Sequence, residues 1–409
     1  MQKQEEKALD GVRVIDFTWA LAGPFATRML GDHGAEIIKI ERQDGDLTRR
    51  VPPFPERSGV NRGGYFNNHN RNKYGMKLNM KDPRGAEIAK KLISKSQVVV
   101  ENFGSGIFER WGFGYEELCK VKPDIILVSM PGFGHSGPYR DQIGYGQTLQ
   151  AFSGWFDLTG YPGHPPSGFS FAFSDYLSGG FAAVMTLAAL KQWRKTGEGC
   201  YIEIPQFEVL VSMLGTNFLD YFVNHRAPGR SGNSLPPHVR AAAPHGAYPC
   251  KGEDRWCVIT LFTDEDWQAF CKAIGTPPWT RESKFTTILG RLENAEELNE
   301  RVGSWTLNHT PDEVMSILQN AGVAAGAVRE IRDLVDMDPQ MKHFGFYVEA
   351  EHAELGKRLF ENTAFRLSDT PGKINWAAPL LGEHMDFVCK EILGMTEDEI
   401  NQYIIDGVL

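Results

Sequence analysis

The 409-residue sequence has few cysteines, no excess of positive charge and no long apolar run. Its six cysteines include no C-x-x-C pair, so the sequence predicts neither a disulfide framework nor a cysteine zinc site and favours a reducing, cytoplasmic location. The formal net charge of −9 argues against nucleic-acid partners and against an anionic membrane surface. A phosphate-bearing ligand would therefore need a local basic pocket.

Membrane-directing segments are also not apparent. Residues Met1–Asp10 are polar and charged, which predicts that the chain carries no signal peptide. The most apolar stretch, Gly179–Leu190, is shorter than the ~20 residues of a spanning helix, and we predict a buried core helix there. We expect a cytoplasmic protein with no membrane partner.

Several catalytic motifs are missing from the sequence. It contains no P-loop, no H-E-x-x-H and no G-x-S-x-G. Where a dinucleotide fingerprint has its glycines, the chain has Ala22-Gly23-Pro24, and Pro24 lacks an amide that could contact a phosphate. We therefore expect no bound dinucleotide and no metal site.

Strand-like runs alternate with helical patterns in the first half of the chain. The predicted strands are Val12–Phe17, Glu36–Ile40, Leu78–Met80, Gln97–Val100, Asp124–Met130 and Tyr201–Ile204, and the predicted helices include 24–30, 83–94, 178–193 and one from Gln206 to Phe222. This alternation predicts an α/β fold with a doubly wound parallel, Rossmann-like sheet. The polar, Gly/Pro-rich stretch 224–244 predicts a boundary before a smaller α+β domain.

Three positions stand out as candidate binding or catalytic residues. Asn102 and Phe103 follow a predicted strand, where an amide beside an aromatic ring can hold adenine or a pantetheine amide; alternatively, Asn102 caps a turn and Phe103 is core. Arg42, after the second strand, could bind a ribose phosphate or could be an ordinary surface arginine.

Asp175 lies just before the apolar helix. A carboxylate there is stabilised as an anion by the helix amides and dipole, by about 0.3–1 kcal/mol. It could be an ordinary N-cap, or a carboxylate nucleophile that forms a covalent acyl or thioester intermediate.

Motifs along the whole chain resemble the family III CoA-transferases, the formyl-CoA and carnitine CoA-transferase group. They are residues 9–18 (LDGVRVIDFT), 22–24 (AGP), 34–41 (GAEIIKIE), 72–73, 82–85, 100–103, 131–134, 195–199, 245–248 and 379–384. The resemblance implies a CoA-transferase whose nucleophile is Asp175. The carboxylate would attack an acyl-CoA, form an aspartyl-CoA thioester and pass CoA to an acceptor acid. CoA esters would be substrates, and no cofactor would be tightly bound.

The resemblance also implies which residues contact CoA. They are Ala20, Leu21, Ala22, Arg42, Leu78, Lys81, Asn102, Phe103 and Arg110. Arg42, Lys81 and Arg110 would supply the local positive charge that the phosphates of CoA require in an acidic protein.

The substrate acids are predicted from positions at which this sequence differs from the formyl-CoA transferases. Leu21 and Ile143 replace a glutamine and a basic residue of those enzymes, which disfavours oxalate and formate. Aromatic residues favour a larger or apolar acid, with Tyr145, Trp19 and Phe171 as candidate contacts. Residues 16–24 and 245–251 are similar to benzylsuccinate CoA-transferase subunits, which suggests succinyl-CoA as donor and a role in aromatic degradation.

The family further implies an interlocked dimer, either a homodimer or a heteromer with a related subunit. We expect a large domain of residues 1–223, to which 345–409 return, and a small domain with linkers over 224–344. Two alternatives stay open. One is a 2-methylacyl-CoA racemase, which requires His135 close to Asp175, and the other is a non-catalytic partner subunit of a heteromeric CoA-transferase.

Overall fold

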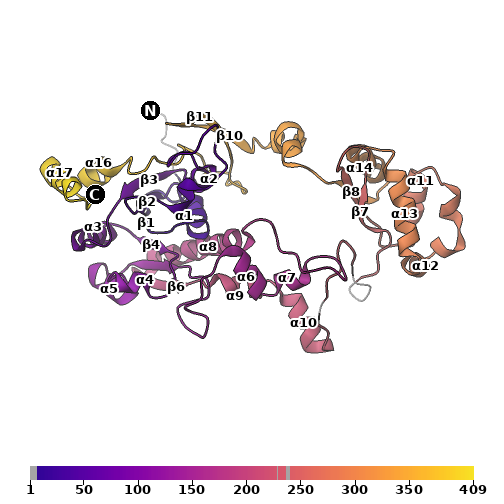
Figure 1. The fold of residues 1–409 in the computed structure, drawn as a ribbon, viewed down its shortest axis with the longest axis horizontal. Helices are drawn as coiled ribbons and strands as arrows, with labels where there is room; N and C mark the ends of the chain where they lie inside the picture. Colours follow the sequence, from indigo (N-terminus) through magenta and orange to yellow (C-terminus); the bar gives the residue numbers. More distant parts are fainter. Residues whose placement is uncertain (1–6, 228, 236–239) are drawn as a thin grey trace. The chain divides into compact units, whose positions relative to one another are not determined.

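The computed structural model describes residues 7–227, 229–235 and 240–409, and Figure 1 shows the order of its elements. Contacts within the chain divide it into two compact units. The large unit comprises Met1–Phe156, Gly168–Ala227 and Met341–Leu409, and the small unit comprises Asp157–Ser167 and Pro228–Gln340. Each unit is described by itself.

The large unit is built on a six-stranded parallel sheet with the order β3-β2-β1-β4-β5-β6. The strands are β1 (Arg13–Asp16), β2 (Glu36–Glu41), β3 (Lys73–Lys77), β4 (Val98–Glu101), β5 (Ile126–Ser129) and β6 (Cys200–Glu203). This order confirms the predicted doubly wound α/β fold. The strand order reverses between β1 and β4, and ligands of such sheets bind beyond the carboxyl ends of the strands at this point.

Alternate residues of the strands enter two separate cores, as expected for a sheet covered on both faces. Ile15 of β1 packs with α3 (Pro83–Ser94) and α5 (Tyr115–Val121). Val14, on the other face, packs with α1 (Ala22–Asp32) and α8 (Phe173–Thr196). The sheet therefore carries helices from distant parts of the sequence on both sides (Figure 1).

The contact between α1 and α8 is close. A Cβ at Gly179 would lie 2.6 Å from the carbonyl oxygen of Ala22, so only glycine permits this approach. Among the described residues, α8 is the one helix that is long and apolar enough to span a membrane by length and composition, and its buried side belongs to the core.

Several predicted boundaries were wrong. The third strand is 73–77, not 78–80, because 78–80 already turns towards α3. Helix α8 begins at Phe173 rather than near 178. The helix predicted from Gln206 to Phe222 is two helices, α9 (Gln206–Ser212) and α10 (Gly215–Asn224). The remaining helices in this part are α2 (Gly64–His69), α4 (Ile107–Arg110), α6 (Gly146–Phe152) and α7 (Trp155–Leu158), with the 3-10 turn η1 (Leu47–Arg50).

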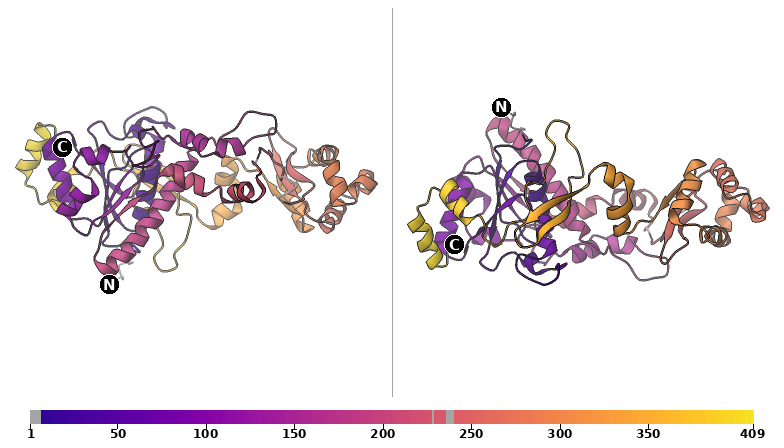
Figure 2. Two further views of the ribbon diagram at one scale, coloured as in Figure 1. Left: turned by 90° about the horizontal axis from the view of Figure 1, so that it is seen from below. Right: turned by 90° about the horizontal axis from the view of Figure 1, so that it is seen from above.

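The C-terminal segment completes the large unit. It forms an antiparallel hairpin, β10 (Tyr347–His352) and β11 (Gly356–Glu361), and then α16 (Met385–Phe387), η5 (Val388–Ile392) and α17 (Glu397–Ile405). Residues of η5 and α17 share a core with α3, and Figure 2 shows these segments side by side.

The small unit combines a three-stranded antiparallel sheet with helices. The strands are β7 (His245–Pro249), β8 (Trp256–Thr260) and β9 (Ala324–Ala327), in that order across the sheet. The helices are α11 (Asp264–Ala273), α12 (Ile288–Glu293), α13 (Ala295–Thr306) and α14 (Pro311–Asn320), with η2 (Pro278–Arg281), η3 (Ser283–Phe285) and η4 (Asp333–Met337). Helix α15 (Pro339–His343) begins in the small unit and ends in the large one. Trp267, Phe270 and Phe285 lie in its core.

Candidate active site

The turn after β1 and the residues after β4 meet where the strand order reverses. The Asn102 side chain accepts a hydrogen bond from the Trp19 amide (2.9 Å) and donates one to the Trp19 carbonyl (3.0 Å). The Trp19 and Phe103 rings lie 5.9 Å apart between centroids. The sequence placed Asn102 and Phe103 at a strand end, but the pairing with Trp19 arises only in the fold.

A buried network of charged side chains lies beneath this turn. Lys73 pairs with Asp16 at 3.0 Å, and Lys39 pairs with Asp46 at 3.2 Å. Burial raises the pKa of Asp16, but the ammonium groups of Lys73 and Lys39 outweigh that effect and lower it to about 2. Because every member has a partner of opposite charge, the network is a rigid base for the turn.

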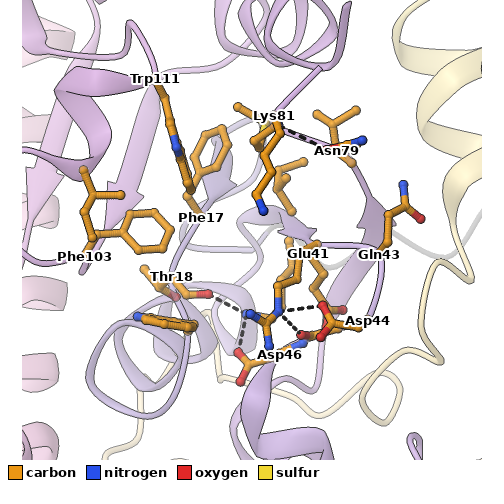
Figure 3. Close-up of a pocket in the computed structure, with 18 residues that line it drawn as sticks. Phe17, Thr18, Glu41, Gln43, Asp44, Asp46, Asn79, Lys81, Phe103 and Trp111 are labelled. Carbon is orange, nitrogen blue, oxygen red and sulfur yellow. Dashed lines mark hydrogen bonds and ion pairs between the residues drawn. The ribbon is translucent and has the colours of Figure 1, made fainter. Parts of the chain in front are cut away.

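A cavity of about 530 Å³ opens beside this base, at the carboxyl ends of β1, β2 and β3 (Figure 3). Five of the candidate residues from the sequence line it, namely Trp19, Arg42, Leu78, Lys81 and Phe103. Phe103 and Trp111 lie on one side, Glu41, Asp44 and Asp46 lie on the other, and the Lys81 side chain reaches in between them (Figure 3). The lining combines aromatic rings suited to a flat base with cations suited to phosphates.

Arg42 is held at the mouth of this cavity by Asp44. Its Nε lies 2.7 Å from a carboxylate oxygen of Asp44, and both side chains are more than half exposed. An exposed ion pair of this kind contributes only about 0–1 kcal/mol, so a phosphate can replace the carboxylate at low cost.

The other predicted CoA contacts do not line the cavity. Ala20, Leu21 and Ala22 continue the chain from Trp19 into α1, and Leu21 and Ala22 are buried. Arg110 ends α4 and is exposed. Asn102 is partly buried and is engaged with Trp19.

Asp175 lies in the first turn of α8, as its third residue, with Ala172 as the N-cap. It is therefore not the N-cap residue that the sequence allowed as an alternative. Its carboxylate accepts a hydrogen bond from the Ser174 hydroxyl (3.1 Å). Burial outweighs hydrogen bonding and raises the pKa of Asp175 to about 6. The backbone amide at the helix N-terminus favours the charged form, as the sequence predicted, but desolvation is the larger effect on the pKa here.

Three further residues beside Asp175 were missed in the sequence. Tyr176 donates its hydroxyl hydrogen to His69 Nε2 (3.1 Å), and the opposite ring nitrogen of His69 bonds to the Tyr65 carbonyl (2.7 Å). Burial lowers the pKa of His69 to about 4, so its ring is neutral at pH 7. Burial also raises the pKa of Tyr65 to about 12, and the charges of Tyr176 and Asp175 add to the shift. One signal for these residues was present in the sequence, namely that Tyr176 directly follows Asp175. Tyr65 and His69 lie on α2, which only folding brings to the site.

Gly146 closes another side of the Asp175 carboxylate. A Cβ at this position would lie 2.8 Å from Asp175 Oδ2. Tyr145, just before it, is 69% exposed. Phe171 is half exposed, and its ring centroid lies 6.3 Å from that of Tyr176. Of the three predicted acid contacts, Tyr145 and Phe171 lie near the Asp175 turn, whereas Trp19 lines the cavity.

His135 contacts residues at the ends of β4, β5 and β6. Its Nε2 lies 2.7 Å from the Ser129 hydroxyl and 3.8 Å from a Glu101 oxygen, and its amide donates to Glu203 (2.6 Å). The neighbouring Glu101 carboxylate raises the pKa of His135. The racemase alternative needs this ring beside Asp175, whereas its Nε2 is directed at Ser129 and Glu101.

The fold and the cavity define an α/β protein with a candidate ligand site at the switch point of a parallel sheet. The chain belongs to CoA-transferase family III, whose family model matches residues 9–385. Succinyl-CoA–D-citramalate CoA-transferase of Chloroflexus aurantiacus is 32% identical over 395 residues, which is 96% of each chain. The beta subunit of succinyl-CoA–L-malate CoA-transferase from the same organism is 32% identical over 397 residues, again 96% of each chain.

A solved structure shows the same fold. The crystal structure of a CAIB/BAIF family protein from Brucella suis has a TM-score of 0.87 at 29% identity and covers 94% of this chain and 99% of that one. The protein is therefore a CoA-transferase, which moves CoA between a CoA thioester and a carboxylic acid. Its substrates are CoA esters and acids.

Proposed function

We propose that the protein transfers CoA from succinyl-CoA to a dicarboxylic acid through an aspartyl-CoA thioester on Asp175. The observation that carries the proposal is the half-buried Asp175 carboxylate in the first turn of α8, the helix whose Gly179 packs against Ala22, three residues after the cavity-lining Trp19. With its pKa raised to about 6, Asp175 is ionised at neutral pH and is more basic than an exposed carboxylate. Both properties favour nucleophilic attack.

The proposed steps balance without a cofactor. Asp175 attacks the thioester carbonyl of the donor, the C–S bond breaks, and CoA thiolate leaves a mixed anhydride. The thiolate then attacks the aspartyl carbonyl, and the donor acid leaves as a carboxylate. The acceptor carboxylate attacks the aspartyl-CoA thioester and releases the thiolate, which attacks the acceptor's acyl carbon. This last step restores the Asp175 carboxylate.

We propose that the cavity of about 530 Å³ holds the nucleotide end of CoA. Phe103 and Leu78 would contact the adenine ring, and Arg42 and Lys81 would pair with the phosphates. Arg110, which ends α4 and does not line the cavity, would add a third cation for the phosphates. The turn 20–22 would then lead the pantetheine arm towards Asp175. A ligand with several phosphates fits these cations better than a neutral one does.

The acceptor acid is proposed from two sources. Relatives at 32% identity are named for D-citramalate and L-malate, which supports a dicarboxylic acceptor. Tyr145 and Phe171, near Asp175, support an aromatic acid such as benzylsuccinate, and with it a role in aromatic degradation. Trp19, which lines the cavity, is the third proposed contact of the acid.

We also propose an interlocked dimer in the cytoplasm. A relative is named as a beta subunit, which supports a heteromer with a related subunit, and a homodimer is the alternative. The proposed domains are 1–223 with 345–409, and 224–344.

Mass spectrometry of the protein after incubation with succinyl-CoA tests the covalent step. We expect a CoA adduct on the Asp175 peptide of the wild type and none in Asp175→Ala. The matched control is Asp398→Ala, which removes an exposed carboxylate on α17 and should leave the adduct unchanged.

Other outcomes contradict the proposal. If the assembled complex keeps its transferase activity when this chain carries Asp175→Ala, this chain is a non-catalytic partner subunit. Incorporation of solvent deuterium at the acyl α-carbon, without CoA exchange between two acids, would indicate a racemase.

A further inference from the structure

A buried serine contacts one oxygen of the Asp175 carboxylate. Ser174 is 0% exposed, and its hydroxyl lies 3.1 Å from Asp175 Oδ2 and 3.5 Å from the Gly146 carbonyl oxygen. A hydroxyl carries a single hydrogen, and the shorter bond to a charged acceptor is the stronger of the two. The Ser174 hydrogen is therefore directed at Oδ2 while Asp175 is ionised.

The same carboxylate oxygen is enclosed by the start of α6. A Cβ at Gly146 would lie 2.8 Å from Asp175 Oδ2 and 3.2 Å from the Ser174 hydroxyl oxygen, so only glycine leaves room for both oxygens. Oδ2 is thus held between a hydroxyl group and a backbone segment. Oδ1 is the oxygen that is left to approach an acyl carbon.

Two glutamine side chains of α6 hold the loop that leads into α8. Gln147 donates to the Phe169 carbonyl (2.8 Å). Gln150, which is 0% exposed, accepts from the Phe169 amide (3.2 Å) and donates to the Phe171 carbonyl (3.2 Å). Because these bonds tie the loop to α6, they keep the start of α6 and the first turn of α8 together around Oδ2.

The oxygen that Ser174 contacts has a particular place in the proposed reaction. If Oδ1 attacks the donor, it becomes the bridging oxygen of the mixed anhydride, and Oδ2 becomes the carbonyl oxygen of the aspartyl group. CoA thiolate then adds to Cγ, and the electron pair of the C=O double bond moves to Oδ2. When this intermediate collapses, the Cγ–Oδ1 bond breaks and Oδ1 leaves with the donor acid. The negative charge therefore develops on Oδ2.

We propose that Ser174 is a catalytic residue that selects Oδ1 as the attacking oxygen and donates a hydrogen bond to the oxyanion that forms on Oδ2. A fixed donor of this kind lowers the barrier, because the oxygen carries more negative charge in the intermediate than in the carbonyl group. The inference rests on the proposed role of Asp175 as the nucleophile.

Counting heavy oxygen atoms in Asp175 tests which of its oxygens reacts. The wild type is incubated with succinyl-CoA and an excess of succinate that carries the heavy oxygen isotope at every carboxylate position, so each CoA exchange returns one labelled oxygen to Asp175. After several exchanges, mass spectrometry should find one labelled oxygen in the Asp175 peptide, because Oδ2 never leaves the enzyme. Two labelled oxygens in most of the wild-type protein would overturn the inference, since both oxygens would then react in turn.

Ser174→Ala removes the hydroxyl group. We expect doubly labelled peptide to accumulate over the same number of exchanges, and the CoA adduct to form about 10-fold to 100-fold more slowly. The Kd for CoA should change little, since Ser174 does not line the cavity. A single label in Ser174→Ala would overturn the inference, because the hydroxyl would then not select the oxygen.

The matched control is Ser178→Ala. Ser178 is also buried on α8, and its hydroxyl has no hydrogen-bond partner among the described residues. Its rate of adduct formation and its single label should match those of the wild type. The count in the wild type needs no variant, so it decides the question even if Ser174→Ala does not fold. If the wild type forms no adduct on Asp175, the proposed function itself fails, and this is established before any oxygen is counted.

Discussion

Gly179 of α8 lies so close to Ala22 of α1 that a Cβ at Gly179 would meet the Ala22 carbonyl oxygen at 2.6 Å, although the two residues are far apart in the sequence. Asp175 lies in the first turn of α8, and Ala22 opens α1 directly after the turn that follows β1. The close approach therefore brings the helix that carries the candidate nucleophile against the segment that follows the cavity-lining Trp19.

Activity should fall on the acid side as Asp175 gains a proton. Because burial raises its pKa to about 6, we expect kcat/KM to drop about tenfold per pH unit below that value. The measurement is the pH profile of CoA transfer, with the Kd for CoA determined over the same range as a control. An acid limb near pH 4 would mean that the carboxylate is not desolvated in the working enzyme.

Asp175→Asn should make the protein more stable at neutral pH. The folded-state pKa of about 6 lies above the ordinary 3.8, so the folded state binds the proton more tightly between these values. The free energy of unfolding therefore decreases as pH rises from about 4 to 6, and the cost is complete above about 6. We expect Asp175→Asn to gain about 1–3 kcal/mol at pH 7.5, measured by urea unfolding. The difference should vanish near pH 4, and a gain that is equal at both pH values would contradict the explanation.

The pair of Arg42 and Asp44 should affect donor binding in opposite directions. Asp44 competes with phosphate for the guanidinium group, at 2.7 Å in the free protein. Arg42→Ala should raise the KM for the acyl-CoA about 10-fold, and Asp44→Ala should lower it about twofold to threefold, both effects shrinking in high salt. Steady-state kinetics at two salt concentrations measures this.

Lys90→Ala is the matched control for these variants, because Lys90 pairs with Glu87 on α3 and does not line the cavity. If Asp44→Ala raised KM as much as Arg42→Ala does, the proposed competition would be wrong.

A side chain at Gly146 should disturb the part of the site around the Asp175 carboxylate. The Cβ of Gly146→Ala would meet Asp175 Oδ2 at 2.8 Å and force the carboxylate to move. We expect kcat to fall about 10-fold, with little change in the Kd for CoA, since the cavity is not touched. Gly180→Ala is the control, because a Cβ there meets nothing within 4 Å. Normal adduct formation in Gly146→Ala would show that the carboxylate has room to shift.

Sequence reasoning predicted the fold class but not the boundaries of every element. The alternation of strand and helix patterns indicates a parallel sheet because crossover helices must cover both of its faces. The third strand was predicted at 78–80 instead of 73–77, because a lysine such as Lys73 is typical of an exposed position. In the fold, Lys73 is buried and pairs with Asp16. The single helix predicted after Gln206 was wrong because the break between α9 and α10 carries no proline.

The sequence by itself determined the class of fold, the chemical types at the strand ends and, through its motifs, the family. These follow from local patterns, in which the period of apolar residues and the position of a side chain after a strand are written directly in the chain. The cavity, the two hydrogen bonds between Asn102 and Trp19 and the pKa of Asp175 were decided only by the tertiary structure. Each depends on desolvation and on contacts between segments that folding brings together, and electrostatic energies of this kind depend on the surroundings more than on the residue itself.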